Sequence, residues 1–99
     1  MEFSWNPAKA KRNRAKHGVS FETAKRIFDD PHLIILEDYD DEFGEMRYHA
    51  LGYAGAHLLL LVVFVGRSEH EEEIIHIISA RKADDYEHKT YARQFTEGD

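Results

Sequence analysis

Residues 74–83 read Ile-Ile-His-Ile-Ile-Ser-Ala-Arg-Lys-Ala, an almost continuous β-branched run that gives way to a charged, helix-favouring segment. Isoleucine is stiff at χ1 and fits a pleated surface, so four isoleucines interrupted by one histidine predict a buried strand. We expect Ser79 to cap a helix that begins at Ala80, because serine is a preferred N-cap residue. Arg81 and Lys82 would then lie in the first helical turn, where cations are disfavoured but an anion is bound well. The stretch therefore predicts a strand that leads into a helix with an anion-binding end.

Length and composition limit the class of protein. A chain of 99 residues without cysteine is expected to form one domain that needs no disulfide or thiolate metal site. Its longest apolar run is the eight residues 58–65, far short of the roughly 20 that span a membrane. The first residues contain no apolar segment typical of a signal peptide. We therefore expect a soluble, cytoplasmic protein without membrane contact, a location that the lack of cysteine also favours.

The net charge of −6 hides two oppositely charged segments. Residues 1–28 contain seven lysines or arginines and two acidic residues, whereas residues 29–73 contain twelve acidic residues and two arginines. A basic helix on an acidic body can present a local positive face to a nucleic acid. The alternative is an ordinary solvated helix surface. Composition alone leaves both interpretations open.

Capping signals predict two helices near the N-terminus, after a short edge strand at Glu2–Trp5. Asn6 is a preferred cap and proline suits the first helical position, so we expect a helix over residues 7–16 that ends at His17-Gly18. A second helix should begin at Ser20 and end at Asp29-Asp30-Pro31, because proline cannot continue it.

The middle of the chain reads as a sheet. Apolar and β-branched runs predict strands over residues 33–39, 46–53, 58–65 and 73–79, with a polar loop over 66–72. Consecutive strands with short links favour an antiparallel meander. A closing helix from Ala80 to about Phe95 should partly cover the sheet. The expected fold class is α+β, with two N-terminal helices, an antiparallel sheet of four or five strands and a C-terminal helix.

Two dense motifs, KHGVSFETA at residues 16–24 and IISARKA at 77–83, occur together with FSWNPAKA at 3–10, FDDP at 28–31 and EMR at 45–47. With these motifs the chain resembles the BrnT family of toxins, a branch of the RelE-like superfamily. The resemblance implies one RelE-like toxin domain over residues 1–99 and a metal-independent endoribonuclease that stops translation. It also implies a BrnA-like antitoxin that neutralises the toxin and carries the only contact with DNA. This chain has His76 where family members usually have arginine.

Cleavage of RNA without a metal requires the neighbouring 2′-hydroxyl to attack phosphorus. The enzyme must place cations on the phosphate oxygens and supply a base and an acid for the two ester oxygens. Guanidinium matches phosphate in a bidentate manner, which draws attention to Arg67 after the third strand and Arg81 after the fourth. These two arginines meet only if the topology brings the strand ends together.

Further candidates lie on the strands. Glu45, Arg47 and His49 alternate along one strand and therefore share a face, where they can serve phosphate binding and proton transfer. The alternative is a surface ion pair between Glu45 and Arg47. His76 is either a proton carrier or a satisfied structural histidine. RNA binding is expected from four basic residues, namely Lys9, Arg12, Lys16 and Lys82.

Neither a metal nor another cofactor is expected, because no HExxH or comparable ligand spacing occurs among the seven histidines. A second function class remains open beside the ribonuclease. A degenerate toxin without catalysis would keep its antitoxin interface and act as a binding module. Tight association with the antitoxin and no growth arrest would distinguish this class from an active toxin.

Overall fold

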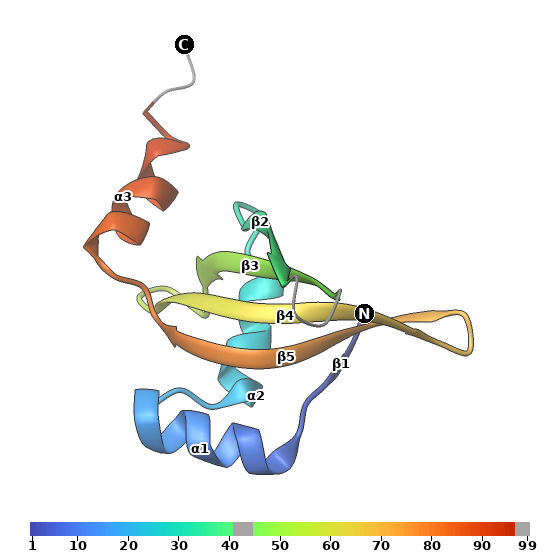
Figure 1. Cartoon of the computed structure of the whole chain (residues 1–99). Helices are drawn as coiled ribbons and strands as arrows, with labels where there is room; N and C mark the ends of the chain where they lie inside the picture. The colour runs from blue at the N-terminus through green and yellow to red at the C-terminus, as the bar shows by residue number, and fades with distance from the viewer. Residues whose placement is uncertain (41–44, 97–99) are drawn as a thin grey trace.

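The computed structural model describes residues 1–40 and 45–96, and within these the side chains of all but residues 37–40 and 45. The chain has an α+β fold, in which α1 and α2 lie beneath a five-stranded sheet and α3 lies at one end of it (Figure 1). The elements are, in chain order, β1 (Glu2–Ser4), α1 (Pro7–His17), α2 (Phe21–Ala24), the 3-10 helix η1 (Lys25–Asp29), β2 (Ile34–Asp40), β3 (Glu45–Tyr53), β4 (Leu59–Glu69), β5 (Glu72–Lys82) and α3 (Asp85–Arg93). No helix within the described residues is long and apolar enough to cross a membrane.

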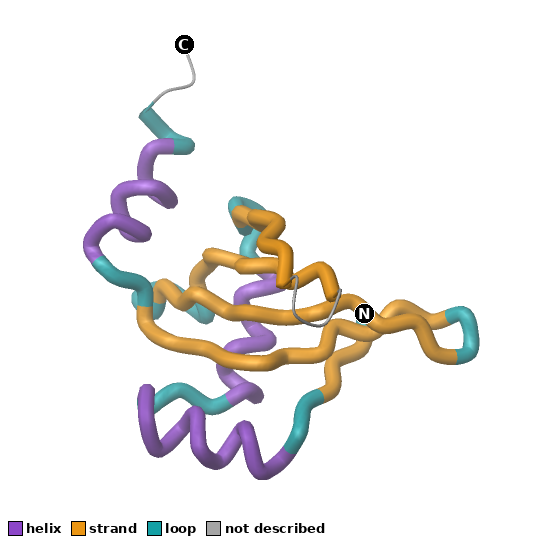
Figure 2. The backbone as a smooth tube through the Cα atoms, in the orientation of Figure 1, coloured by secondary structure: helices purple, strands orange, loops and turns teal. Residues whose placement is uncertain are grey.

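The sheet has the strand order β1-β5-β4-β3-β2, and its last four strands form the predicted antiparallel meander (Figure 2). β1 differs from the prediction because it pairs with β5 in parallel, which makes the sheet mixed. A parallel pair needs a long connection, and two helices and three strands separate β1 from β5 in the sequence. The predicted α+β class, with two N-terminal helices and a closing helix, is confirmed.

The main hydrophobic core lies between the sheet and the two N-terminal helices. Phe21 of α2 and Ile27 of η1 belong to one buried cluster with Leu60, Val62 and Ile77 of β4 and β5. We call this side of the sheet the helical face and the opposite side the open face. Since side chains alternate along a strand, the neighbours of these core residues point to the open face.

The helix signals read from the sequence are confirmed. The Asn6 side chain accepts hydrogen bonds from two backbone N–H groups of the first turn, at 2.9 and 3.1 Å. Gly18 ends α1 in the left-handed conformation with φ 72°, which glycine adopts without a Cβ penalty. Ser20 accepts a hydrogen bond from the Thr23 N–H at 3.1 Å. The second helix consists of one α-helical turn that continues as the 3-10 helix η1.

The predicted polar loop over residues 66–72 is wrong, because β4 and β5 continue through it as a long hairpin. Pairing extends to Glu69 and Glu72, and the turn is made by His70 and Glu71 with positive φ angles of 52° and 68°. Figure 1 shows this hairpin projecting beyond the other strands. Its exposed polar residues are typical of a loop in sequence. The two strands can nevertheless continue, because backbone pairing does not require apolar side chains.

The predicted helix start at Ala80 with Ser79 as its cap is also wrong. β5 continues to Lys82, and Ala80 is buried opposite Val62 of β4. The closing helix begins at Asp85 and is capped by Asp84, which accepts a hydrogen bond from the Glu87 N–H at 2.8 Å. Ala80 is buried where β5 packs against α1, and this packing keeps the segment extended. Arg81 and Lys82 therefore do not lie at the N-terminus of a helix.

α3 covers one end of the open face, in agreement with the predicted closing helix. Tyr91 of α3 packs in a buried cluster with Leu51, Leu59 and Leu61. Its hydroxyl donates a 2.6 Å hydrogen bond to Asp30, which follows η1. Burial and this hydrogen bond raise the pKa of Tyr91 well above its ordinary value. The rest of the open face, toward the hairpin, is where the candidate site lies.

Candidate active site on the open face of the sheet

Three of the predicted residues surround Val65 on the open face. Arg47 of β3 lies opposite Val65 of β4, and Val65 lies opposite His76 of β5. Arg67 is the next residue on the same face of β4. Side chains directly opposite one another have Cβ atoms about 5 Å apart, and diagonal neighbours are about 7–8 Å apart. We call these four residues the Val65 cluster.

The Val65 cluster has the composition of an anion site. Arg47 and Arg67 come from neighbouring strands on either side of the register position of Val65, and the half-buried His76 lies opposite Val65 on the third strand. Val65 itself is only 4% exposed, so the polar groups around it lie over an apolar floor. The register therefore places two arginines and one histidine next to one buried apolar residue.

His49 lies beside this cluster. It pairs with Val63, one step along the same face of β3 and β4, and Val63 in turn pairs with Ser79. A second imidazole therefore shares the open face with His76, two strands away. Glu45 belongs to β3, but its side chain lies outside those that the structure describes.

Ser4 also lies on the open face, and it was not among the site residues predicted from the sequence. β1 pairs in parallel with β5, so that Ser4 lies opposite His76 at the edge of the sheet. The Ser4 Oγ is 2.8 Å from the Nδ1 of His76, within hydrogen-bond distance. The only signal in the sequence was that Ser4 alternates with Phe3 and Trp5 of the predicted edge strand. The partner of that strand could not be read from the pattern.

Arg81 shares the open face but lies at its opposite end, and the structure does not bring it to Arg67. It pairs with Leu61, which is six residues from Arg67 along β4, or about 20 Å at the usual rise of a strand. Its guanidinium makes a bidentate pair with Glu87 of α3, at 2.7 and 2.8 Å. Hydrogen bonding to Glu87 raises the pKa of Arg81, and the same bonds lower the pKa of Glu87.

We expect this ion pair to hold α3 on the sheet. Glu87→Gln should lower the free energy of unfolding by about 1 kcal/mol, because the Arg81 side chain is 38% exposed and solvent screens the pair. The lowered pKa of Glu87 means that its contribution is present above the usual carboxyl pKa and is lost as the pH falls through the folded value. Urea unfolding at neutral and acidic pH should show the difference shrinking in acid. Glu22→Gln, at an exposed position of α2, is the control, and an equal loss there would contradict the assignment.

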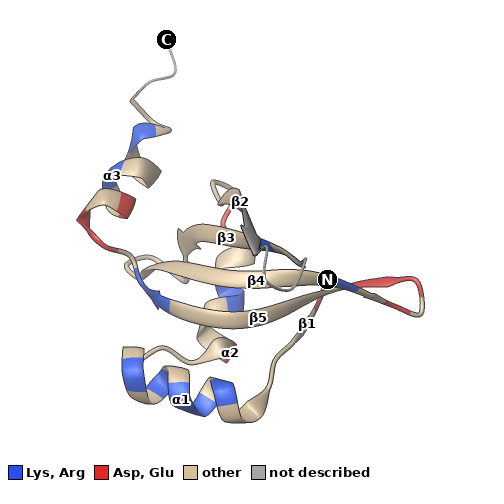
Figure 3. Ribbon diagram, viewed as in Figure 1, with Lys and Arg blue, Asp and Glu red and all other residues tan. Residues whose placement is uncertain are grey.

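The four predicted RNA-binding residues lie away from the Val65 cluster. Lys9, Arg12 and Lys16 are exposed on α1, and Figure 3 shows the basic residues of this helix beneath the sheet. Lys82 pairs with Leu60, whose side chain belongs to the core on the helical face. The sheet therefore separates this basic group from Arg47 and Arg67.

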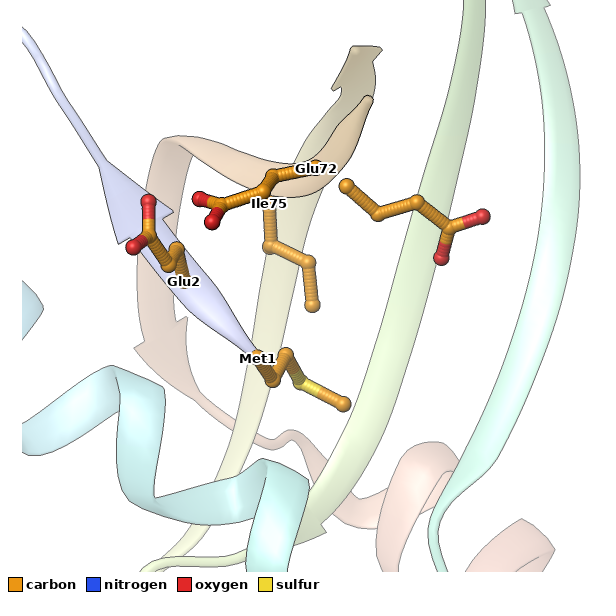
Figure 4. A pocket seen from close by; sticks show the side chains of 5 residues that line it. Met1, Glu2, Glu72 and Ile75 are labelled. Atoms are coloured by element: carbon orange, nitrogen blue, oxygen red, sulfur yellow. The ribbon is translucent and has the colours of Figure 1, made fainter. Parts of the chain in front are cut away.

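A hollow at the base of the hairpin differs from the Val65 cluster in the charge of its lining. It has a volume of about 640 Å³ and is lined by Met1, Glu2, Glu72, Glu73 and Ile75. In Figure 4 the Ile75 side chain extends toward Met1 inside a rim that carries carboxylates. Three acidic side chains repel a phosphate, so this hollow is a poor site for RNA. Among the residues that the structure describes, no three His, Asp or Glu side chains are placed to hold a metal ion together.

Comparison with known proteins places the chain in a family. The family model described as "Ribonuclease toxin, BrnT, of type II toxin-antitoxin system" matches residues 5–87. The crystal structure of the Brucella abortus ribonuclease toxin BrnT superimposes with a TM-score of 0.64 at 23% sequence identity, covering 86% of this chain and 99% of that one. No curated protein matches the sequence. Because the family model spans most of the chain, the protein belongs to the BrnT family of ribonuclease toxins of type II toxin–antitoxin systems.

Proposed function

We propose that this toxin is a metal-independent endoribonuclease that cleaves RNA at the Val65 cluster and thereby stops translation. The observation that supports the proposal is the strand register, which sets Arg47, Arg67 and His76 around Val65 on one face of three adjacent strands. Family membership supports ribonuclease activity in general. The cluster supplies the cations that a reaction without a metal needs at the phosphate.

The arginines act on the charge that develops at phosphorus. Attack by the 2′-hydroxyl builds negative charge on the non-bridging phosphate oxygens, and a guanidinium fork binds two such oxygens at once. Arg47 and Arg67 approach from different strands, so they can bind opposite sides of one phosphate. The paired strands fix the backbone of both residues before the substrate arrives, which lowers the cost of reorganisation in the transition state.

The two histidines supply the proton transfers. We assign His76 as the base that removes the proton of the 2′-hydroxyl and His49 as the acid that protonates the leaving 5′-oxygen, because they lie on opposite sides of Val63 and Val65. Glu45, two residues before Arg47 in the sequence, is the alternative proton carrier. The 2′-oxygen forms its bond to phosphorus as the bond to the 5′-oxygen breaks, which leaves a 2′,3′-cyclic phosphate and a 5′-hydroxyl.

The remaining predicted residues take other roles in this proposal. Arg81 anchors α3 through Glu87 and does not bind the scissile phosphate. Lys9, Arg12, Lys16 and Lys82 lie across the sheet, so they attract RNA by their field and contact only distant parts of a long strand.

Membership of a type II system implies an antitoxin partner. We propose a BrnA-like antitoxin, which would neutralise the toxin in the cytoplasm and carry the DNA contact for both proteins. The partner's own DNA-binding domain is needed because this chain is acidic overall, with a net charge of −6.

Cleavage products and growth test the proposal together. Purified toxin is expected to cleave RNA equally well with and without EDTA and to leave 2′,3′-cyclic phosphate ends, which end-group analysis detects. Expression alone should arrest growth, and coexpression with the antitoxin should restore it. Loss of cleavage in EDTA would contradict the metal-free mechanism. Antitoxin binding without growth arrest or cleavage would establish the non-catalytic binding module instead.

A further inference from the structure

The Ser4–His76 pair is a side-chain contact that joins the N-terminal edge strand to the candidate site. The Ser4 Oγ lies 2.8 Å from Nδ1 of the half-buried His76 ring. Ser4 precedes the range of the family match, which begins at residue 5. The contact exists because β1 runs parallel to β5 in a register that sets Ser4 opposite His76.

We propose that Ser4 is a positioning residue that accepts a hydrogen bond from the Nδ1–H of His76 and so keeps Nε2 as the nitrogen that takes up the proton. This inference rests on the proposed function, in which His76 accepts the proton of the RNA 2′-hydroxyl. A neutral imidazole carries its hydrogen on one nitrogen only, and the partner of that nitrogen sets which one. A serine oxygen accepts equally from the neutral Nδ1–H form and from imidazolium, so the contact survives the proton transfer.

Charged residues share the open face with His76. Arg67 lies diagonally across on β4, and Arg47 lies beyond Val65 on β3. Glu2 of β1 and Glu72 of β5 lie on the same face. Ser4 adds a neutral acceptor at Nδ1 that stabilises imidazolium without competing with phosphate for the arginines.

The direction of the proton follows from this assignment. In the first step the proton moves from the 2′-hydroxyl to Nε2 of His76, while the 2′-oxygen bonds to phosphorus and the 5′-oxygen leaves with a proton from the acid on the other side. If Ser4 instead donated to Nδ1, the hydrogen of neutral His76 would sit on Nε2, and no lone pair would face the hydroxyl. The two hydrogen-bond directions therefore predict opposite tautomers.

Nitrogen NMR of the full chain with labelled histidine reads the tautomer directly, and His76→Ala identifies the signal. The wild-type protein is expected to show the Nδ1–H form in its neutral state, and Ser4→Ala should shift the ring toward Nε2–H. Ser4→Thr keeps the hydroxyl and should restore the wild-type tautomer. Ser79→Ala is the matched control, because Ser79 lies on the same face of β5 opposite Val63.

Cleavage assays on the same variants give a second readout. Ser4→Ala should lower kcat about tenfold with little change in KM. The limb of the pH–rate profile that reports the deprotonated base should move toward lower pH. Ser4→Thr should recover most of the rate. An unchanged tautomer in Ser4→Ala overturns the inference even if the protein proves to be an active ribonuclease. A switched tautomer with an unchanged cleavage rate also overturns the catalytic role of the contact. Absence of cleavage by the wild-type protein would contradict the proposed function and not the hydrogen-bond assignment.

Discussion

Arg67→Ala is expected to lower kcat/KM for RNA cleavage about 10²- to 10³-fold, the usual cost of removing one group that stabilises transition-state charge. Arg47→Ala should have an effect of similar size, since both arginines neighbour Val65 in the register of the open face. Arg67→Lys should recover only part of the rate, because an ammonium group cannot bind two phosphate oxygens in the manner of the planar fork. Single-turnover cleavage of a short RNA measures these differences without interference from product release.

The control for Arg67 is Arg26→Ala, an exposed arginine of η1 on the other side of the sheet, which should change cleavage less than twofold. The double variant Arg47→Ala/Arg67→Ala should lose less than the product of the single losses if both side chains bind one phosphate. Strict multiplicative losses would place the two arginines at different phosphates. Full activity in Arg67→Ala would remove the Val65 cluster as the cleavage centre.

The parts of the fold that the sequence predicted depend on local chemistry. Asn6 and Ser20 cap their helices, and Gly18 ends α1 in the left-handed conformation that it alone adopts freely. Ser79 carries the same capping chemistry as Ser20, yet it lies in a strand. The difference is tertiary, because β5 pairs with β4 through this segment and Asn13 of α1 bonds both the N–H and the C=O of Ala80.

Strand pairing at the candidate site could likewise be predicted only in part from the sequence. Alternation along one strand placed Arg47 and His49 on a common face, and the structure agrees. Alternation along β5 would place His76 and Arg81 on opposite faces, since five positions separate them. A register shift at Val63 and Phe64 inserts one extra residue in β5 and brings both onto the open face. No local pattern in the sequence indicates that shift, and the parallel partner of Ser4 is equally hidden.

Asn13 provides the largest expected effect on stability. Its side chain is only 8% exposed and makes three hydrogen bonds to buried backbone, two of which join α1 to Ala80 of β5. Nδ2 donates to the carbonyl oxygens of Val19 at 3.0 Å and Ala80 at 2.8 Å, and Oδ1 accepts from the Ala80 N–H at 3.1 Å. Each group that is left buried without a partner costs about 1–3 kcal/mol. Asn13→Ala should therefore lower the free energy of unfolding by about 3–5 kcal/mol, a large share of the total for a small domain.

Urea unfolding of two further variants separates this bridge from ordinary helix capping. Asn6→Ala removes an exposed cap and should cost only about 1 kcal/mol. Asn13→Asp keeps the acceptor for the Ala80 N–H but turns a carboxylate toward two carbonyl oxygens, so its loss should match that of Asn13→Ala at neutral pH and diminish in acid, where a protonated carboxyl can donate. A cost for Asn13→Ala no greater than that for Asn6→Ala would show that the backbone at Ala80 finds other partners. The predicted cost instead requires α1 to hold β5 extended past Ser79, which fixes the strand that carries His76.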